Sequence, residues 1–222
     1  MQVLGIETAT PTCSVALWRD GALAGEIRYR QDRVHAEIIS GLVQDVVKQC
    51  DAPLTTLDGL AVSIGPGSFT GLRIGLALAK GLAFGGDLPI VGVNTADAIA
   101  ASVYPKDERM IVALASRKGE VYAAKYRILD NAYTREGQVE AVVSGQFAEW
   151  ADGVSLIAGT GVASLQSAGV GEFEFVSEHY WQIGSAAVAR LGARRIIAGD
   201  FDDVNVLEPE YVKPFFTTAV TA

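Results

Sequence analysis

The stretch Gly65-Pro66-Gly67-Ser68-Phe69-Thr70-Gly71 decides how the rest of this chain is organised. It follows an apolar run at 60–64, which is typical of a buried strand, and it precedes a long apolar segment at 72–84. Proline fixes one φ angle and glycine permits angles that other residues avoid, so the stretch predicts a tight turn between a strand and a helix. Ser68 or Thr70 can cap that helix.

A strand, a glycine turn and a helix N-terminus together can bind an anion, because the first N–H groups of a helix have no partner within it. The spacing, however, is one residue too long for G-x-G-x-x-G, and no Gly-Lys-Ser/Thr follows as in a P-loop. Two interpretations of Gly65, Gly67 and Ser68 therefore stay open. One is a structural turn, the commoner use of such glycines, and the other is a phosphate loop.

The helix predicted over 72–84 is apolar around almost its whole circumference. Its charged residues, Arg73 and Lys80, fall on one narrow strip. Gly71, Gly75 and Ala79 recur at every fourth position, which would let another helix approach closely along that line. A central core helix and a helix that also contacts a second protein chain are equally open interpretations.

Composition limits the functions open to the chain. Its 222 residues are half hydrophobic and carry a net charge of −8, without a run of lysine or arginine. A globular protein is expected, and a direct, tight grip on a nucleic-acid backbone is not, because that grip needs clustered cations. Cys13 and Cys50 are too few for a disulfide framework. No signal peptide or membrane span is predicted, so the cytosol is the expected location.

Strand and helix patterns predict an α/β fold built from two similar lobes. The predicted boundary falls in the polar segment 105–109 and divides the chain into 1–106 and 107–222. Asp20-Gly21 predicts a hairpin turn, and the tail at 206–214 is expected to be extended and to pack back on the body. The predicted strands are 3–6, 14–18, 22–29, 60–64, 89–93, 110–115, 120–128, 138–143 and 156–158, and the predicted helices are 33–49, 72–84, 95–104, 147–150 and 183–198.

Glu7 ends the first predicted strand, and hydroxyl residues follow it. A carboxylate at this place, before a hairpin, resembles the actin, sugar-kinase and Hsp70 type of nucleotide fold, in which the loop faces phosphate. The simpler interpretation, which we favour, is that Glu7 accepts hydrogen bonds from turn amides. With the glycine turn above, the residues that could meet a nucleotide are Glu7, Thr8, Thr10, Gly159 and Gly161.

The segment 33–49 has helical periodicity, and its apolar residues cover about half of the helix circumference, wider than a simple core stripe. One edge of so wide an arc could face the chain's own sheet and the other edge a partner. His35 projects into this arc, and we interpret it as a hydrogen-bonded core or interface residue rather than a ligand.

Several motifs together resemble the TsaB (YeaZ) family. They are Ile6-Glu7-Thr8-Ala9-Thr10 with 13–18, His35 on a helix, the glycine turn continued by Leu72-Arg73-Ile74-Gly75, and the segments 118–122, 159–161 and 208–212. The match runs in order over nearly the whole chain, and the glycine turn followed by Phe-Thr-Gly-Leu-Arg is its specific part. The resemblance implies two lobes of the actin-like (ASKHA, ribonuclease H-like) fold, with mixed sheets flanked by helices.

The resemblance also implies a function. The family serves the bacterial pathway that makes N6-threonylcarbamoyladenosine (t6A) at position 37 of tRNAs reading codons that start with A. Its members are not the transferase: they bind the catalytic paralogue TsaD through helices of the first lobe, the ATPase TsaE joins them, and alone they form homodimers. On this resemblance tRNA is met indirectly through the complex, no cofactor is required, and ATP or ADP is a candidate ligand at the partner interface.

The helices implied in partner binding correspond to 33–49 and 69–84, the two segments whose apolar surface exceeds what one core requires. Replacing Leu76 by Glu is accordingly expected to break an association without unfolding the chain. The residues predicted to face the partner are His35, Ile38, Ile39, Leu42, Val46, Phe69, Leu72, Arg73, Leu76 and Lys80.

The paralogue's metal site tests whether this chain could itself be catalytic. That site places two histidines four residues apart after a Val-Asn pair, where this chain has Thr95 and Ile99. Ile99 has no donor atom, and the sequence contains only two histidines, His35 and His179, so a histidine-rich metal site cannot be built.

Relatives of this family carry Asp where this chain has Glu7 and Ala115. The loss of the second carboxylate weakens an independent ATPase, because phosphate chemistry needs acids to hold Mg²⁺. The leading hypothesis is therefore a non-catalytic scaffold subunit. The alternative is a kinase-like ATPase that holds ATP between 5–17 and 159–161. A peptidase, an older label for the family, is disfavoured because the sequence has neither H-E-x-x-H nor G-x-S-x-G.

Overall fold

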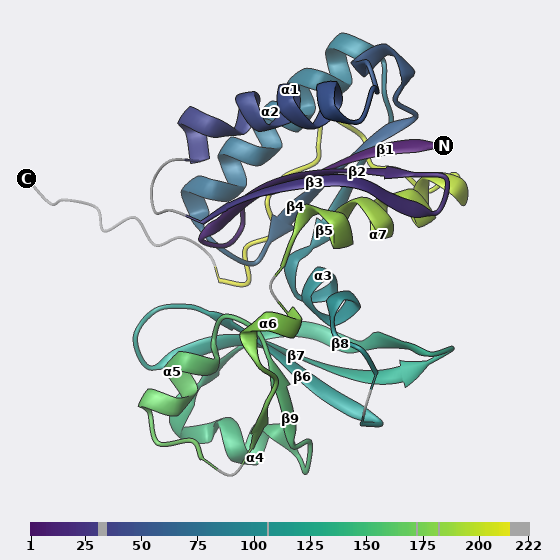
Figure 1. Cartoon of the computed structure of the whole chain (residues 1–222). Helices are drawn as coiled ribbons and strands as arrows, with labels where there is room; N and C mark the ends of the chain where they lie inside the picture. Colours follow the sequence, from purple (N-terminus) through teal and green to yellow (C-terminus); the bar gives the residue numbers. More distant parts are fainter. Residues whose placement is uncertain (31–34, 106, 172, 182, 214–222) are drawn as a thin grey trace, which may run out of the picture.

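Two five-stranded sheets, one in each lobe, form the centre of the molecule (Figure 1). The structure is a computed structural model that describes residues 1–30, 35–105, 107–171, 173–181 and 183–213. The first sheet contains β1 (Gln2–Glu7), β2 (Thr12–Arg19), β3 (Ala22–Arg30), β4 (Gly59–Gly65) and β5 (Ile90–Asn94). The second contains β6 (Arg109–Ala115), β7 (Glu120–Leu129), β8 (Ala132–Val143), β9 (Leu156–Ala158) and β10 (Glu174–Phe175).

The helices lie between and around these strands. They are α1 (His35–Gln49), α2 (Phe69–Gly86), α3 (Thr95–Ser102), α4 (Phe147–Ala151), α5 (Val162–Ser167), α6 (Glu178–Trp181) and α7 (Ser185–Ile197), with 3₁₀ turns at Leu54–Thr56 and Ser144–Gln146. The predicted elements are found close to these bounds. Residues 33 and 34 of the predicted helix 33–49 lie outside the described residues. Sequence reasoning missed α5, β10 and α6, because elements of two to six residues are too short to show a period.

Both sheets have the same connectivity. In the first, the order is β3-β2-β1-β4-β5, with β1, β2 and β3 antiparallel and with β4 and β5 parallel to β1. In the second, the order β8-β7-β6-β9-β10 repeats this pattern strand for strand. This duplicated arrangement is the two-lobed actin-like, ribonuclease H-like fold, which confirms the predicted fold class.

Local turn chemistry sets the two long hairpins. Asp20 and Gly21 both have positive φ angles, 49° and 86°, as the predicted turn between β2 and β3 requires. Asp130 and Asn131, with φ angles of 51° and 61°, make the corresponding turn between β7 and β8. The sequence analysis did not predict this second turn and therefore placed the start of the following strand at 138. In the structure, β8 begins at Ala132. Asp and Asn tolerate the left-handed region, and a turn of this kind needs no glycine.

Helices from each half of the chain cross to the other lobe. α1 and α2 cover one face of the first sheet, and α7, from the C-terminal half, packs on β1, β2 and β4. It comes so close that a Cβ added to Gly5 would lie 2.4 Å from the carbonyl oxygen of Ser185. α3, from the N-terminal half, lies between the lobes and contacts β6 and β8 (Figure 1). The predicted boundary ends the first lobe at residue 106, which lies outside the described residues.

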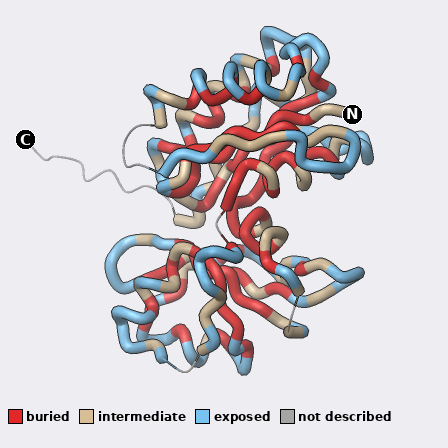
Figure 2. Tube along the Cα trace, viewed as in Figure 1, coloured by how far each residue is buried: buried red, intermediate tan, exposed pale blue. Residues whose placement is uncertain are grey.

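Buried residues follow both sheets, and exposed ones follow the outer sides of the helices (Figure 2). One core lies between the first sheet and α1 and α2. A second runs from the other face of that sheet through α7 and α3 to the second sheet, and a third lies under α4 and α5. Because β1 is covered on both faces, its residues from Val3 to Glu7 are all buried, which explains its uninterrupted apolar pattern.

The tail packs back on the first lobe, as predicted for its described part. The Asp202 N–H donates to the Ile90 carbonyl (2.9 Å), and the Glu210 N–H donates to the Ile64 carbonyl (2.6 Å). Residue 214 of the predicted tail lies outside the described residues. None of the helices formed by the described residues is long and apolar enough to cross a membrane.

Candidate functional site

A cleft of about 1570 Å³ opens between the two lobes. Its walls come from equivalent places in the two halves of the fold: the loop after the first strand of each sheet and the glycine turn after the fourth. In the first lobe these walls include Thr10, Gly67 and Ser68, and in the second they include Ala115 and Gly159. The duplicated fold therefore brings together most of the loops that the sequence singled out as nucleotide candidates.

The first-lobe loops are held to each other by backbone hydrogen bonds. Glu7 Oε1 accepts from the N–H groups of Ala9 (2.7 Å) and Thr10 (3.1 Å). The Ala9 carbonyl accepts from the N–H of Ser68 (2.7 Å), which joins the hairpin loop to the glycine turn. His35 Nε2 donates to the Thr10 carbonyl (3.0 Å), so His35 is a hydrogen-bonded residue as predicted. The backbone N–H groups of Ala9, Thr10 and Ser68 are thus already used inside the lobe.

Glu7 is a structural carboxyl group in a fully buried position. Burial raises its pKa to about 7, although hydrogen bonds involving Ser63, Ala9 and Thr10 act in the opposite direction. Its Oε1 serves two turn amides, which confirms the interpretation favoured from the sequence, while Oε2 has no hydrogen-bond partner among the described residues. Burial, and then the nearby charge of Glu7, raise the pKa of Cys13 to about 12. Glu7 itself does not line the cleft.

The glycines after β4 are required by close backbone contacts. Gly65 has a φ angle of 121°, and a Cβ on Gly67 would lie 2.3 Å from the carbonyl oxygen of Ala9. Ser68 caps α2 by accepting from the Gly71 N–H (3.2 Å). The line of Gly71 and Gly75 was expected to admit a second helix. That expectation is wrong, because the loop residue Thr8 already occupies the space beside both glycines.

The second lobe repeats this pattern of loops bound to each other. The Ala115 N–H donates to Thr160 Oγ1 (2.9 Å), and the Gly161 N–H donates to the Ala113 carbonyl (2.9 Å). Gly159 has a φ angle of 112°, and a Cβ there would lie 2.3 Å from the Ala113 carbonyl oxygen. The structural requirement for glycine is therefore the same in both halves of the cleft.

The charged residues at the cleft are paired. Arg30 at the end of β3 forms an ion pair with Glu178 of α6, which joins the two lobes. Glu120 at the start of β7 pairs with Arg117 (3.1 Å) and with Lys213 of the tail (2.6 Å). Within the described ranges, no three His, Cys, Asp or Glu residues are grouped so that they could hold a metal ion. Both acids among the described residues that line the cleft, Glu120 and Glu178, are thus already engaged by cations of the same chain.

A family model described as "TsaD: tRNA N6-adenosine threonylcarbamoyltransferase" matches residues 24–188. The tRNA threonylcarbamoyladenosine biosynthesis protein TsaB of Escherichia coli (strain K12) is 41% identical over 145 residues, which are 64% of this chain and 62% of that protein. TsaB of Haemophilus influenzae is 35% identical over 124 residues, 55% of this chain and 52% of that protein. The chain belongs to the TsaB/YeaZ family. Its matches to these relatives span less than two thirds of their length.

The fold agrees with a solved structure described as an uncharacterized protein of Pseudomonas aeruginosa with similarity to the peptidase YeaZ. Its TM-score is 0.82 at 24% identity, and the match covers 96% of this chain and 99% of that one. At the positions where the TsaD paralogue is expected to carry its metal histidines, this TsaB/YeaZ chain has Thr95 and Ile99, both buried in α3.

Half of the residues predicted to face a partner are covered by their own chain. They are at most 9% exposed and belong to the interior of the first lobe: Ile39, Leu42, Val46, Leu72 and Leu76. Leu76 in particular lies in the core between the sheet and the two helices. This burial argues against the expectation that Leu76→Glu would leave the fold intact, because the substitution would place a carboxylate in an apolar core.

The other predicted partner residues lie at the surface: His35, Ile38, Phe69, Arg73 and Lys80 are half-buried or exposed. Their place in an interface stays a prediction. The Arg73 guanidinium lies over the Phe69 ring (3.9 Å), and its Nε donates to the hydroxyl of Tyr211 (3.2 Å). Arg73 is thus held by its own chain at the N-terminal end of α2.

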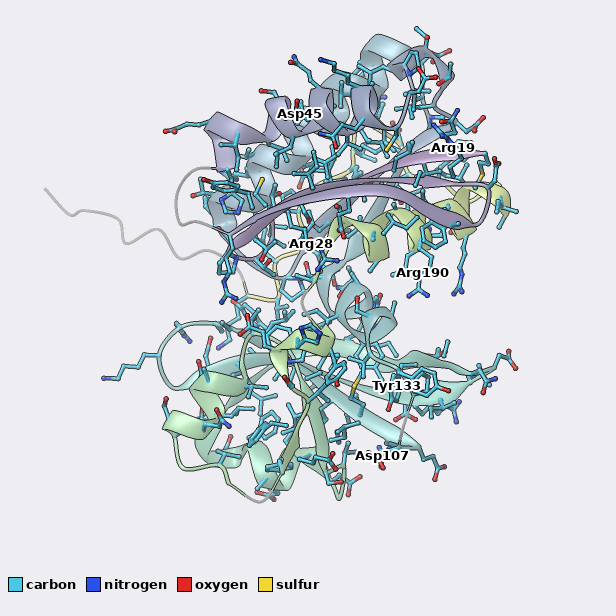
Figure 3. The ribbon with its side chains drawn as sticks, viewed as in Figure 1. Arg19, Arg28, Asp45, Asp107, Tyr133 and Arg190 are labelled. Atoms are coloured by element: carbon cyan, nitrogen blue, oxygen red, sulfur yellow. The ribbon has the colours of Figure 1, made fainter. Side chains whose placement is uncertain are left out.

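Sequence reasoning missed two parts of this surface. The open side of α2 carries Ala77, Gly81 and Phe84, and a Cβ on Gly81 would meet nothing within 4 Å. Arg73 and Lys80, the charged strip predicted from the sequence, lie on this same side of the helix, so the strip was the signal for the open side. The second part is the contact of the tail with the cleft through Lys213. The sequence analysis identifies the adjacent motif 208–212 but does not predict this contact. Figure 3 shows Arg28 in the region between the lobes and Asp45 on α1, on the far side of the first lobe.

Proposed function

We propose that this chain is a non-catalytic subunit required for N6-threonylcarbamoylation of adenosine 37 in tRNAs reading ANN codons, and that it acts by binding the catalytic paralogue TsaD. The observation that carries the proposal is the open side of α2, where Ala77, Gly81 and Phe84 are exposed on an apolar helix. Membership of the TsaB/YeaZ family supports the pathway, because the matched relatives are described as t6A biosynthesis proteins.

The open side of α2 suits a second helix of a partner. Ala77 and Gly81 are four residues apart and carry no side chain beyond Cβ, so a partner helix could approach the backbone closely there. Phe84 is 63% exposed at the end of the same stripe and offers a large apolar group to bury. A partner that covers this stripe would remove apolar surface from water without contacting the buried residues of the predicted set.

The state of the cleft supports a non-catalytic role. Two loop amides on the first-lobe side are bound to Glu7, and the cleft acids Glu120 and Glu178 are paired with cations of the same chain. A nucleotide-hydrolysing cleft of this fold would need free donors for phosphate and free acids for Mg²⁺. On this proposal the chain requires no cofactor of its own, meets tRNA through the complex, is joined by TsaE, and forms homodimers when alone in the cytoplasm.

The volume and position of the cleft favour one alternative, a kinase-like ATPase of the same superfamily. That function predicts saturable ATP binding and turnover by the isolated chain. The scaffold proposal predicts no turnover by the isolated chain and t6A only when TsaD is present.

The deciding experiment measures the light-scattering mass of the chain alone and mixed with TsaD from the same cell. Nucleoside mass spectrometry then follows on tRNA incubated with these proteins, TsaE, ATP and an activated threonylcarbamoyl donor. We expect a homodimer that converts to a heterodimer, with t6A formed in the mixture and not by either protein alone. Ala77→Glu should abolish the heterodimer and leave the melting temperature unchanged. The matched control, Thr134→Glu on the exposed part of β8, should leave both unchanged.

Two results would contradict the proposal. One is a TsaD preparation that makes t6A at full rate without this chain. The other is an Ala77→Glu variant that still forms the heterodimer with unchanged affinity, which would remove the open side of α2 from the interface.

A further inference from the structure

We infer that residues 200–213, here called the strap, couple the N-terminal end of α2 to the width of the cleft between the lobes. The strap follows α7, runs along the first lobe and ends at the second (yellow in Figure 1). It contacts three places in succession: the free edge of β5, the turn and helix start at 65–69, and the start of β7. A displacement of the strap at any one of these places should therefore also displace it at the other two.

The first contact fixes the strap to the edge of the first sheet. The Asp202 N–H donates to the Ile90 carbonyl (2.9 Å), and Asp202 Oδ2 accepts from the Gly92 N–H (2.7 Å). Arg195 of α7 binds Asp202 (3.2 Å) and Asp200 (2.7 Å) at the same point. The strap thus covers an edge strand whose N–H and carbonyl groups would otherwise be open, and its start is rigidly placed.

The second contact lies at the glycine turn and the N-terminal end of α2. Glu210 N–H donates to the Ile64 carbonyl (2.6 Å), and the Glu210 carboxylate accepts from the Asn94 side chain (2.7 Å). One residue further, the Tyr211 ring lies 5.5 Å from the Phe69 ring, and its hydroxyl accepts from Arg73. Phe69 and Arg73 belong to the predicted partner face, so the strap is in direct contact with that face.

The third contact reaches the second lobe. Lys213 Nζ lies 2.6 Å from Oε2 of Glu120, and both residues line the cleft. Glu120 is buried whereas the Lys213 side chain is 36% exposed, so one partner of this ion pair is shielded from solvent and the other is not. Only Val212 lies between Tyr211 and Lys213. A shift of the Tyr211 ring away from Phe69 should therefore move the end of the strap.

The consequence is a link between partner binding and the cleft. A partner that takes Phe69 and Arg73 away from Tyr211 would draw Lys213 from Glu120. Among the described residues that line the cleft, Arg30–Glu178 would then still join the lobes. The lobes would then separate more easily. The partner is the one of the proposed function. The link between the strap and the cleft is a property of the chain by itself and is tested without a partner, so the two proposals can fail separately.

The test is the distance between nitroxide labels on the two lobes of the isolated chain, measured by double electron–electron resonance. Gln44→Cys on α1 and Glu149→Cys on α4 place labels at exposed sites. The background is Ala77→Glu with Cys50→Ser, which removes the expected homodimer, so that no label of a second copy contributes, and leaves Cys13 buried. Lys213→Ala and Tyr211→Ala should each lengthen the mean distance and broaden its distribution. Combining the two should add nothing further, because both act through one strap.

Two controls separate the strap from general loosening. Lys118→Ala removes an exposed lysine beside the same loop and should leave the distances unchanged. Arg30→Ala breaks a second ion pair at the cleft, Arg30–Glu178, and should add to the effect of Lys213→Ala, since it acts independently. The inference is overturned if Tyr211→Ala leaves the interlobe distance unchanged while Lys213→Ala lengthens it, or if neither variant changes it.

Discussion

Gly71 of α2 and Thr8 of the first hairpin loop are so close that a Cβ on Gly71 would lie 2.1 Å from the Thr8 carbonyl oxygen. One turn further, a Cβ on Gly75 would lie 2.1 Å from Thr8 Oγ1. This contact seats the N-terminal half of α2 on the loop that holds Glu7, and it explains why an apolar helix carries glycine at these two positions. The open side of the same helix carries Gly81, which has no such neighbour.

Alanine at these glycines should have opposite effects. Gly71→Ala is expected to lower the free energy of unfolding by about 1–3 kcal/mol, because the Thr8 backbone must move to admit the methyl group. Gly81→Ala, the matched control in the same helix, should raise it by up to about 1 kcal/mol, because alanine is the better helix former and meets open space. Urea unfolding of the isolated chain measures both. Equal effects of the two substitutions would contradict the close contact with Thr8.

Neighbouring positions of α2 should separate folding from association. Leu76 is 5% exposed, so Leu76→Glu is expected to cost at least about 3 kcal/mol of folding free energy, because it buries a carboxylate without a partner. Ala77 is exposed, and Ala77→Glu should leave the melting temperature within a few degrees of the original. Circular dichroism melts of the two variants decide this. A folded Leu76→Glu protein would show that this side of α2 is not the core side.

The pH dependence of stability should carry the signature of Glu7. Its pKa is about 7 in the folded chain against an ordinary 4.5, so the folded state binds this proton more tightly than the unfolded state does. The contribution of Glu7 to the free energy of unfolding therefore falls as pH rises from 4.5 to about 7, and this contribution is constant above that range. Glu7→Gln cannot ionise, so its stability relative to the original should improve by up to about 3 kcal/mol across that window.

The control for this pH effect is Glu37→Gln, because Glu37 is exposed on α1. Its stability relative to the original chain should not change with pH across the same window. Unfolding free energies at pH 5, 6, 7 and 8 give both comparisons. If the difference in unfolding free energy between Glu7→Gln and the original chain is the same at all four pH values, the pKa of Glu7 is not raised by folding.

The two thiols should react at very different rates. Cys13 is buried and burial, together with Glu7, raises its pKa to about 12, so its reactive thiolate is scarce at neutral pH. Cys50 is only half-buried. With Ellman's reagent at pH 7.5, we expect one fast thiol in the native chain and the second only on unfolding. Cys50→Ser should remove the fast phase. A fast phase that survives this substitution would mean that the β2 strand opens readily.

The sequence by itself determined the features that depend on local rules. The turn after β4, the cap by Ser68 and the hairpin at Asp20-Gly21 follow from φ angles and side-chain acceptors within a few residues. The role of Glu7 as an acceptor for turn amides was inferred correctly for the same reason, since its partners Ala9 and Thr10 are two and three residues away.

Only the tertiary structure decided what covers the buried side of α2 and where the tail ends. The strip of Arg73 and Lys80 marks the exposed side of the helix, but no periodicity shows that the loop residue Thr8, rather than a second helix, packs against Gly71 and Gly75. The ion pair of Lys213 with Glu120 joins residues 93 positions apart, and α7 crosses to the first sheet. Such contacts depend on how two separate lobes are assembled, and no local pattern in the chain encodes that distance.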